Sequence, residues 1–214
     1  MRKPVWQTSE QGSADWLKAR CGNLTASRMA DAIAFLKGGK ETEARRKYKI
    51  ELVAERMTDL MVSRYVNDAM QWGIEQEAPA KSRYEEVTGS FITPCGFAIH
   101  GEIFGFGASP DGLVDDDGLV EIKCPTTPTY VEWITAGVVP PQHHAQLLAQ
   151  LAVTGRRYVD FLAYDPRIKV YEHQHFLRRF EPPEADIAAI EEAARKFLAE
   201  VEELFESVTS KEVA

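Results

Sequence analysis

The sequence predicts an α/β protein with a mainly helical N-terminal part, a mixed β-sheet flanked by helices, and a long C-terminal helix. Apolar residues recur at helical spacing up to about residue 90 and again after residue 180. Residues 90–124 are instead rich in Phe, Ile, Val and Gly, a composition that favours strands. A helical segment then separates these strands from two more, and a helix that crosses between strands is typical of an α/β domain.

Four helices are predicted in the first 90 residues. Ser13 can cap the first helix, and Gly38 and Gly39 break the chain after the second. The fourth helix contains Pro79, which can kink it, and it ends before Gly89, a favourable C-cap residue. The expected helices cover residues 13–20, 25–36, 41–63 and 68–87.

The predicted sheet has three strands before the crossing helix and two strands after it. Residues 115–118 (Asp-Asp-Asp-Gly) lie between apolar runs, which indicates a hairpin turn. The final helix carries an apolar stripe that should pack on the domain or on a neighbouring subunit. The expected strands cover residues 91–100, 103–108, 119–124, 157–164 and 168–177, and the remaining helices cover residues 129–136, 142–154 and 184–207.

The length of 214 residues indicates a single domain. We expect a helical part over residues 1–90, a sheet-containing core over residues 91–180 and an acidic amphipathic helix within residues 181–214. No CxxC pair occurs among Cys21, Cys95 and Cys124, which disfavours a disulfide framework or a zinc ribbon. The N-terminus has no apolar leader and no apolar run is long enough to span a membrane, so we expect a cytoplasmic protein without a membrane partner.

The net charge of −8 argues against a nucleic-acid partner at first sight, but the charge is unevenly distributed. Residues 181–214 carry ten acids and three bases, whereas residues 1–50 carry eleven bases and five acids. A local basic face is therefore compatible with the acidic total. The simpler alternative is that the basic run at residues 44–49 is a solvated helix face. The acidic final helix should lie away from bound phosphate or face a basic surface.

The most informative motif is Ser109-Pro110-Asp111, then nine residues, then Glu121-Ile122-Lys123. Side chains alternate along a strand, so Glu121 and Lys123 share one side, and antiparallel pairing can return Asp111 beside Glu121. Two carboxylates and a main-chain carbonyl form an oxygen site suited to Mg²⁺ or Mn²⁺. A nearby lysine can orient or activate an attacking water, so the set is suited to hydrolysis of a phosphodiester.

Two alternatives accompany this interpretation. Asp111 could simply begin a turn, with Glu121 and Lys123 on an exposed strand face. The acids at residues 115–117 are rival ligands, although three adjacent acids at a hairpin tip are explained by turn chemistry. The apolar neighbours of Glu121 favour the metal site, because charges in an apolar strand need partners.

Other chemistries have weaker support in the sequence. His143 and His144 are adjacent and point in different directions, unlike a helical zinc pair, so we expect them to be structural or close to DNA. The sequence contains neither a phosphate-binding GxxxxGK[ST] loop nor a GxSxG nucleophile motif. The glycine-rich residues 101–107 fit a strand better than a dinucleotide loop, because no helix is expected after them.

Together with several shorter motifs, the Asp111 to Lys123 segment resembles the lambda exonuclease (YqaJ-type) branch of the PD-(D/E)xK nucleases. The resemblance implies a restriction-endonuclease-like core and a phage or prophage protein acting in a bacterial cell. The matching segments follow the family's order, and they are Glu10-Gln11-Gly12 with Trp16, RCGNLTAS at residues 20–27, Trp72-Gly73 with Glu77, Tyr84-Glu85 with Thr88-Gly89, Ser109 to Leu113, Glu121 to Pro125, Ala145-Gln146 with Val153-Thr154-Gly155, and Tyr164-Asp165-Pro166-Arg167.

The resemblance implies a Mg²⁺-dependent alkaline exonuclease that degrades linear double-stranded DNA from the 5′ end and leaves a 3′ single-stranded tail for recombination. Matched by position, Asp111, Glu121, the Ile122 carbonyl and Glu77 would hold two metal ions, with Mn²⁺ able to replace Mg²⁺. Lys123 would be the catalytic lysine. Gln146 matches an active-site glutamine of the family. Leu148 stands where lambda exonuclease has a second glutamine, so Gln150 is an alternative.

The same resemblance implies a pocket for a 5′-phosphate. Arg20, Thr25, Ser27 and Ser109 match its positions, and a guanidinium with hydroxyl groups at a helix start suits a phosphate. Met70 matches an apolar wedge that splits the terminal base pair, although a methionine at helical spacing is also typical of a core. The family further implies a processive homotrimeric ring and a single-strand annealing protein as partner. A restriction-like endonuclease and a catalytically inactive DNA-end-binding module are the rival functions.

Overall fold

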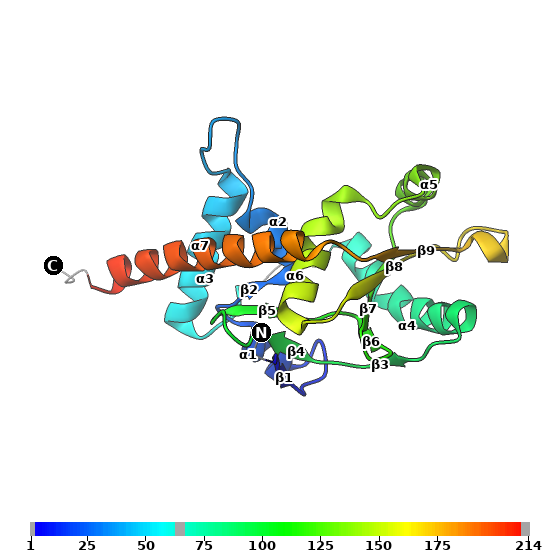
Figure 1. Cartoon of the computed structure of the whole chain (residues 1–214), viewed down its shortest axis with the longest axis horizontal. Helices are drawn as coiled ribbons and strands as arrows, with labels where there is room; N and C mark the ends of the chain where they lie inside the picture. Colours follow the sequence, from blue (N-terminus) through cyan, green and yellow to red (C-terminus); the bar gives the residue numbers. More distant parts are fainter. Residues whose placement is uncertain (1–2, 63–66, 211–214) are drawn as a thin grey trace.

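The computed structural model describes residues 3–62 and 67–210. It contains two mixed β-sheets flanked by helices, which confirms the predicted α/β class, although the sequence predicts one sheet (Figure 1). The first sheet has the strand order β1-β4-β5-β2 and the second has the order β3-β6-β7-β8-β9. The strands are β1 (Val5–Gln7), β2 (Leu24–Thr25), β3 (Ile92–Thr93), β4 (Phe97–Ile99), β5 (Phe106–Ala108), β6 (Gly112–Val114), β7 (Gly118–Lys123), β8 (Tyr158–Tyr164) and β9 (His175–Phe180).

Seven α-helices occur in the described part of the chain, together with three 3₁₀ turns. α5 and α6 form the crossover between β7 and β8, which pair in parallel. The helices are α1 (Ala14–Arg20), α2 (Met29–Ala32), α3 (Glu43–Thr58), α4 (Asp68–Thr88), α5 (Thr127–Ala136), α6 (His144–Thr154) and α7 (Glu184–Thr209), and the 3₁₀ turns are Ala26–Arg28, Pro141–His143 and Tyr171–His173.

Local capping signals predict several helix boundaries correctly. The Ser13 hydroxyl accepts a hydrogen bond from the Trp16 N–H at the start of α1. Gly89 and Gly155 end α4 and α6 in the left-handed conformation, as expected. Pro79 lies inside α4 without interrupting it. These helices therefore begin and end close to where sequence alone places them.

Two helices are shorter than the sequence predicts. The helix expected over residues 25–36 is replaced by β2, a 3₁₀ turn and the single turn of α2. The chain then forms a hairpin in which Leu36 N–H donates to the Lys40 carbonyl, and Thr42 caps α3. α3 ends at Thr58 because Asp59 adopts a left-handed conformation with φ of 55°. Residue 63, the expected end of this helix, lies outside the described residues.

The strands differ more from expectation than the helices do. The strand expected over residues 91–100 is two strands, β3 and β4, which belong to different sheets. Pro94 interrupts the strand hydrogen bonding, and a Cβ at Gly96 would lie 2.0 Å from the Gln7 carbonyl, so the chain needs glycine where it turns towards β1. β9 begins at His175 rather than 168, because residues 168–174 form turns held by the Gln174 side chain.

The hairpin turn that is predicted within the most informative motif is present. Residues 115–117 connect β6 to β7, and Gly112 pairs with Val120 in the antiparallel register. The expected strand over 119–124 is β7, but its hairpin partner β6 is absent from the prediction. This register brings the residue before Gly112, Asp111, to the level of Glu121.

α7 packs against α2, α3 and α6 (Figure 1), and its apolar stripe shares one buried cluster with residues of these helices. Its ring residue Phe197 stacks on Tyr48 of α3 with ring centroids 5.6 Å apart. The buried residues of the stripe are Ile190, Ala194, Phe197, Leu198 and Val201. The predicted stripe is therefore part of the core of this chain.

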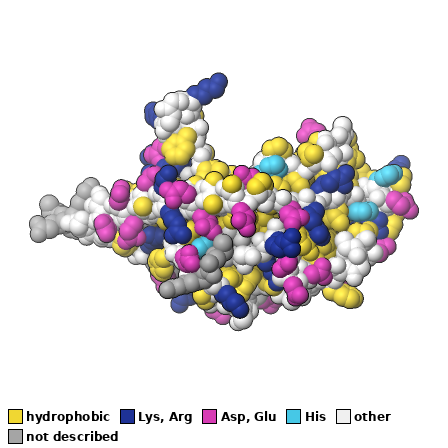
Figure 2. Space-filling model, in the orientation of Figure 1, with side chains coloured by type: hydrophobic (Ala, Val, Ile, Leu, Met, Phe, Trp, Pro, Cys, Tyr) yellow, Lys and Arg dark blue, Asp and Glu magenta, His cyan; other side chains and the backbone are white. Residues whose placement is uncertain are grey.

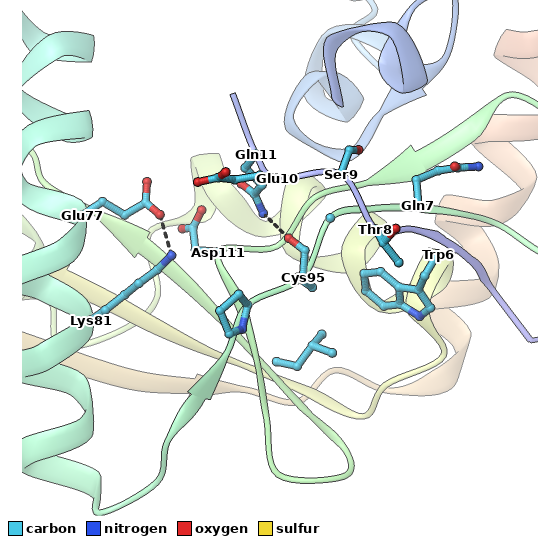
Figure 3. A pocket seen from close by; sticks show the side chains of 13 residues that line it. Trp6, Gln7, Thr8, Ser9, Glu10, Gln11, Glu77, Lys81, Cys95 and Asp111 are labelled. Carbon is cyan, nitrogen blue, oxygen red and sulfur yellow. Dashed lines mark hydrogen bonds and ion pairs between the residues drawn. The ribbon is translucent and has the colours of Figure 1, made fainter. Parts of the chain in front are cut away.

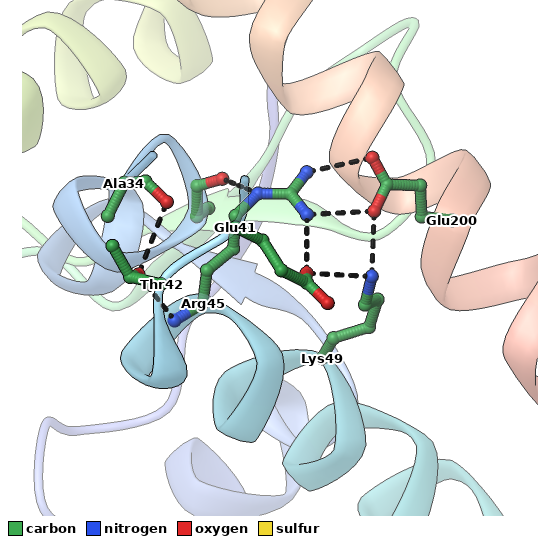
Figure 4. A network of polar contacts seen from close by, with 7 residues as sticks. Ala34, Glu41, Thr42, Arg45, Lys49 and Glu200 are labelled. Atoms are coloured by element: carbon green, nitrogen blue, oxygen red, sulfur yellow. Dashed lines mark hydrogen bonds and ion pairs between the residues drawn. The ribbon is translucent and has the colours of Figure 1, made fainter. Parts of the chain in front are cut away.

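The acidic side of α7 faces basic residues of α3 in the same chain. Glu200 receives two hydrogen bonds of 2.8 Å from Arg45 and a third of 2.8 Å from Lys49 (Figure 4). The hydrogen bonds and positive charges of Arg45 and then Lys49 lower the pKa of Glu200 to about 2. Part of the positive charge of residues 1–50 is thus neutralised by α7. Figure 2 accordingly shows acidic and basic side chains interspersed on this face of the molecule.

No helix within residues 3–62 and 67–210 is both long and apolar enough to cross a bilayer.

Candidate active site

Asp111 and Glu121 meet at the point where β6 and β7 separate. The Asp111 Oδ2 atom accepts a hydrogen bond of 2.6 Å from the backbone N–H of Ile122. This bond takes the place of the next backbone hydrogen bond between β6 and β7, so the Asp111 carboxyl group is fixed beside the strand that carries Glu121. Ile122 faces α4 and packs with Tyr84, whereas Glu121 faces α6.

Glu121 is a buried carboxylate with every oxygen hydrogen-bonded. It is 2% exposed in the middle of an apolar strand. Its Oε1 accepts bonds of 2.5 Å from the Lys123 Nζ and 2.6 Å from the Gln146 amide, and its Oε2 accepts one of 2.6 Å from the Gln150 amide. Both glutamines therefore reach the carboxylate, because residues four apart lie on one face of α6. The sequence left open which of the two does so.

Electrostatics at this site favours bound positive charge. Burial raises the pKa of Asp111 well above its ordinary value, and the neighbouring Glu121 carboxylate raises it further. Burial by itself lowers the pKa of Lys123, but the negative charges of Glu121 and Asp111 outweigh it and raise that pKa above its usual value. Lys123 is therefore an ammonium that offsets one of two crowded carboxylates.

Glu77 approaches Asp111 from α4 across a cavity of about 660 Å³. Figure 3 shows the two carboxyl groups facing each other at one end of this cavity, and the Glu77 charge contributes to the raised pKa of Asp111. Glu77 is half-exposed and forms an ion pair of 2.7 Å with Lys81, one turn further along α4. The structure thus places Glu77 near the site but not in direct contact with it.

The donor set suits a hard divalent cation. Carboxylate and carbonyl oxygens are the ligands that Mg²⁺ and Mn²⁺ prefer, and Asp111, Glu121 and the Ile122 main chain lie together. In the described part of the chain, however, no three His, Cys, Asp or Glu side chains gather closely enough to hold an ion. A cation here would therefore rest on two carboxylates and the main chain, with Glu77 nearby and paired to Lys81 through one of its oxygens.

Arg20 and Ser109 form a second polar site next to the first. The Arg20 guanidinium lies 3.3 Å from the Ser109 hydroxyl, which also accepts a bond of 2.9 Å from the Trp16 indole. Trp16 stacks on the guanidinium at 4.2 Å, and the buried Nε of Arg20 has no hydrogen-bond partner among the described residues. Burial lowers the pKa of Arg20 from its usual value. A half-buried guanidinium with no acid partner within residues 3–62 and 67–210 is suited to binding an anion.

Thr25 and Ser27 lie on the segment that follows Arg20. Their hydroxyl groups are 3.3 Å apart at the start of the 3₁₀ turn, and the Thr25 N–H donates to the Tyr48 hydroxyl. β2 pairs in parallel with β5, the strand that leads to Ser109, so Thr25 and Ser109 lie at the ends of adjacent strands. Ser27 follows in the 3₁₀ turn after β2, and Arg20 reaches Ser109 from the end of α1.

Three further residues bear on the predicted sites. Met70 is 47% exposed in the first turn of α4, so it is not a core residue. The Gln11 amide donates to the Cys95 and Pro110 carbonyls and holds the segment just before Asp111. His143 packs against Trp133 and Phe161 beneath the site, and burial lowers its pKa to about 4. Gln11 and His143 act through contacts between distant segments, for which the sequence has no local signal.

Comparison with known proteins gives one family and a set of similar structures. The YqaJ-like viral recombinase domain matches residues 15–157. Two crystal structures of an alkaline exonuclease from Laribacter hongkongensis (LHK-Exo), one of them with dAMP, are 42% identical in sequence, with a TM-score of 0.84 over 92% of this chain and 96% of theirs. A phage-related exonuclease from Haemophilus somnus shares the fold at 14% identity and a TM-score of 0.61, over 87% of this chain and 96% of that one. No curated protein sequence matches the chain.

Proposed function

Because this chain belongs to the YqaJ-like viral recombinase domain family, we propose that it is a metal-dependent 5′-to-3′ exonuclease of double-stranded DNA. The observation that carries the proposal is the placement of Asp111 on the Ile122 N–H, beside the Glu121–Lys123 pair, with Gln146 and Gln150 fixing the buried carboxylate. Such preorganised charge next to a cavity suits phosphodiester hydrolysis better than binding alone. An inactive end-binding module would have no need for a buried lysine and carboxylate pair.

Asp111, Glu121 and the Ile122 carbonyl would hold Mg²⁺, or Mn²⁺ in its place, and Glu77 would contribute to a second ion. When bound, the metal would act as a Lewis acid on the scissile phosphodiester. Lys123 would orient the attacking water and stabilise the negative charge that develops on phosphate oxygens, since its ammonium is held at the Glu121 carboxylate. Gln146 and Gln150 would keep that carboxylate in place during the reaction.

The polarity of the proposed reaction rests on the Arg20 site. Arg20, Thr25, Ser27 and Ser109 would bind a terminal 5′-phosphate close to the metal ligands, so that the first phosphodiester is the one cut. Ser109 lies two residues before Asp111, which supports this spacing. The product would be a 5′-mononucleotide, the class of compound to which dAMP, bound in one LHK-Exo structure, belongs. Exposed Met70 would lie against the terminal base pair as a wedge.

We further propose a homotrimeric ring and a single-strand annealing protein that receives the 3′ tail. An enzyme that removes many nucleotides in succession must stay on its substrate, and a closed ring of head-to-tail subunits achieves this. The acidic total charge and the pairing of α3 with α7 support this route, because sliding held by charge alone needs a strongly basic surface. The proposed setting is the cytoplasm of a bacterium that carries the phage or prophage.

Arg20→Ala is expected to abolish most of the preference for 5′-phosphorylated ends. The guanidinium donates to the Ser109 hydroxyl, and a guanidinium can bind phosphate through two hydrogen bonds. Initial rates on duplexes with 5′-phosphate and 5′-hydroxyl ends measure the ratio, and calorimetry with Mn²⁺ serves as the control for metal binding. Equal rates on both kinds of end, in the wild type and the variant alike, would contradict the assignment of a phosphate pocket.

A further inference from the structure

The turn that carries Arg20 is held from α3 by two consecutive side chains. The Gly22 N–H donates to the Glu55 Oε2 at 2.9 Å, and the Gly22 carbonyl accepts a bond of 3.0 Å from the Arg56 Nε. Both polar backbone groups of Gly22 are thus bound by side chains rather than by strand or helix partners. Gly22 has φ of +69°, and a Cβ there would lie 2.8 Å from the Arg56 Cγ, so the arginine stem packs directly on the turn.

Arg56 also contacts the segment that leads to Ser109. A Cβ built at Gly105 would lie 3.2 Å from the Arg56 Nη2, and the Gly105 carbonyl accepts a bond of 2.8 Å from the Leu24 N–H. β5 begins at the next residue and ends directly before Ser109. The Arg56 side chain therefore lies against two segments, one that follows Arg20 and one that leads to Ser109. The Arg20 Nη1 and Ser109 Oγ atoms are 3.3 Å apart.

The charges of Glu55 and Arg56 are already used within the protein. Arg56 forms an ion pair of 2.9 Å with Glu202 of α7, and its side chain is 17% exposed. Glu55 is buried, with one oxygen on the Gly22 N–H and the other on the Val62 N–H. Both groups are engaged within the protein, so we expect their effect on the 5′ end to pass through the geometry of the turn.

We propose that Arg56, together with Glu55, is a positioning residue for the 5′-phosphate pocket. By holding Gly22 against the residue before β5, it sets the spacing between the Arg20 guanidinium and the Ser109 hydroxyl. This inference rests on the proposed function, since it assigns a support to a pocket that function requires. The role depends on the hydrogen bond that Arg56 donates to Gly22, not on its positive charge.

Three substitutions separate the hydrogen bond from the charge. Arg56→Met keeps an apolar side chain of similar length and removes both the hydrogen-bond donor and the charge. Arg56→Gln keeps a donor without charge, and Arg56→Lys keeps a charged donor. The measured quantity is the ratio of initial rates on 5′-phosphorylated and 5′-hydroxyl duplex ends. We expect Arg56→Met to lower this ratio about tenfold, because small displacements of a binding group have large effects on rate. Arg56→Gln and Arg56→Lys should retain most of the ratio, and Arg46→Ala, which changes an exposed arginine near the other end of α3, should leave it unchanged.

A double-mutant comparison excludes a merely structural role. In an Arg20→Ala background, Arg56→Met should have no further effect on the ratio, whereas general destabilisation would lower activity on both ends in either background. Two results would overturn the positioning role while leaving the pocket intact. One is a wild-type ratio in Arg56→Met, and the other is a reduced ratio in Arg56→Gln together with a wild-type ratio in Arg56→Lys. A ratio of one in the wild type would instead overturn the pocket itself, and the role of Arg56 with it.

Discussion

Lys123→Ala is expected to lower the rate of DNA cleavage by about 10²–10³-fold, the typical effect of removing a group that stabilises developing charge. The ammonium lies 2.5 Å from the Glu121 Oε1 and has no role in the apolar core, so the fold should change little. Glu121 keeps its bonds from Gln146 and Gln150 in the variant. Initial rates on linear duplex DNA at saturating Mg²⁺ measure the loss.

The control for this variant is Lys196→Ala, which removes a lysine from the exposed side of α7, where it forms an ion pair with Glu192. It should cleave at the wild-type rate. Anisotropy with a labelled duplex end should show that Lys123→Ala still binds DNA. Near-normal turnover by Lys123→Ala would contradict the assignment of Lys123.

Truncation after Pro182, which removes α7, is expected to prevent the protein from folding and assembling. Five side chains of this helix are buried against α2, α3 and α6, including Phe197 on Tyr48. Each large apolar side chain contributes about 1.5–3 kcal/mol on burial, and the total stability of a domain is only about 5–15 kcal/mol. The truncated chain would also expose its apolar partners, so aggregation or subunit dissociation should be visible by light scattering.

A milder variant keeps this prediction testable when the truncated chain is insoluble. Phe197→Ala should reduce the free energy of unfolding by about 3–5 kcal/mol, the usual effect of deleting a buried aromatic ring. Glu203→Gln, on the exposed side of the same helix, should leave it unchanged. A truncated protein that stays folded, assembled and active would show that α7 is dispensable.

The parts of the fold that follow from local sequence were predicted well. Ser13, Gly89 and Gly155 act within one turn of chain, so the boundaries that they set can be read directly. The short strands were predicted poorly, because β1 and β2 have three and two residues and exist only through pairing with β4 and β5. The division of residues 91–100 between two sheets likewise depends on the close approach of Gly96 to Gln7.

The same distinction applies to the candidate site. Asp111, Glu121 and Lys123 lie on one hairpin, so their meeting follows from strand register and could be predicted. The sequence offers Gln146 and Gln150 as alternatives on one helix face, and only the structure shows that both reach Glu121, each at 2.6 Å. The support of Arg20 by Glu55 and Arg56 joins residues more than 30 positions apart and has no sequence signal.

The most direct test of the proposed function compares linear duplex DNA with covalently closed circular duplex of the same sequence, with Mg²⁺ and with a chelator. An exonuclease that starts from a 5′ end should convert the linear DNA to 3′-tailed molecules and mononucleotides, leave the closed circle intact, and release nothing when the metal is removed. Cleavage of the closed circle would contradict the account in favour of an endonuclease, and end binding without any release of nucleotides would contradict it in favour of an inactive module.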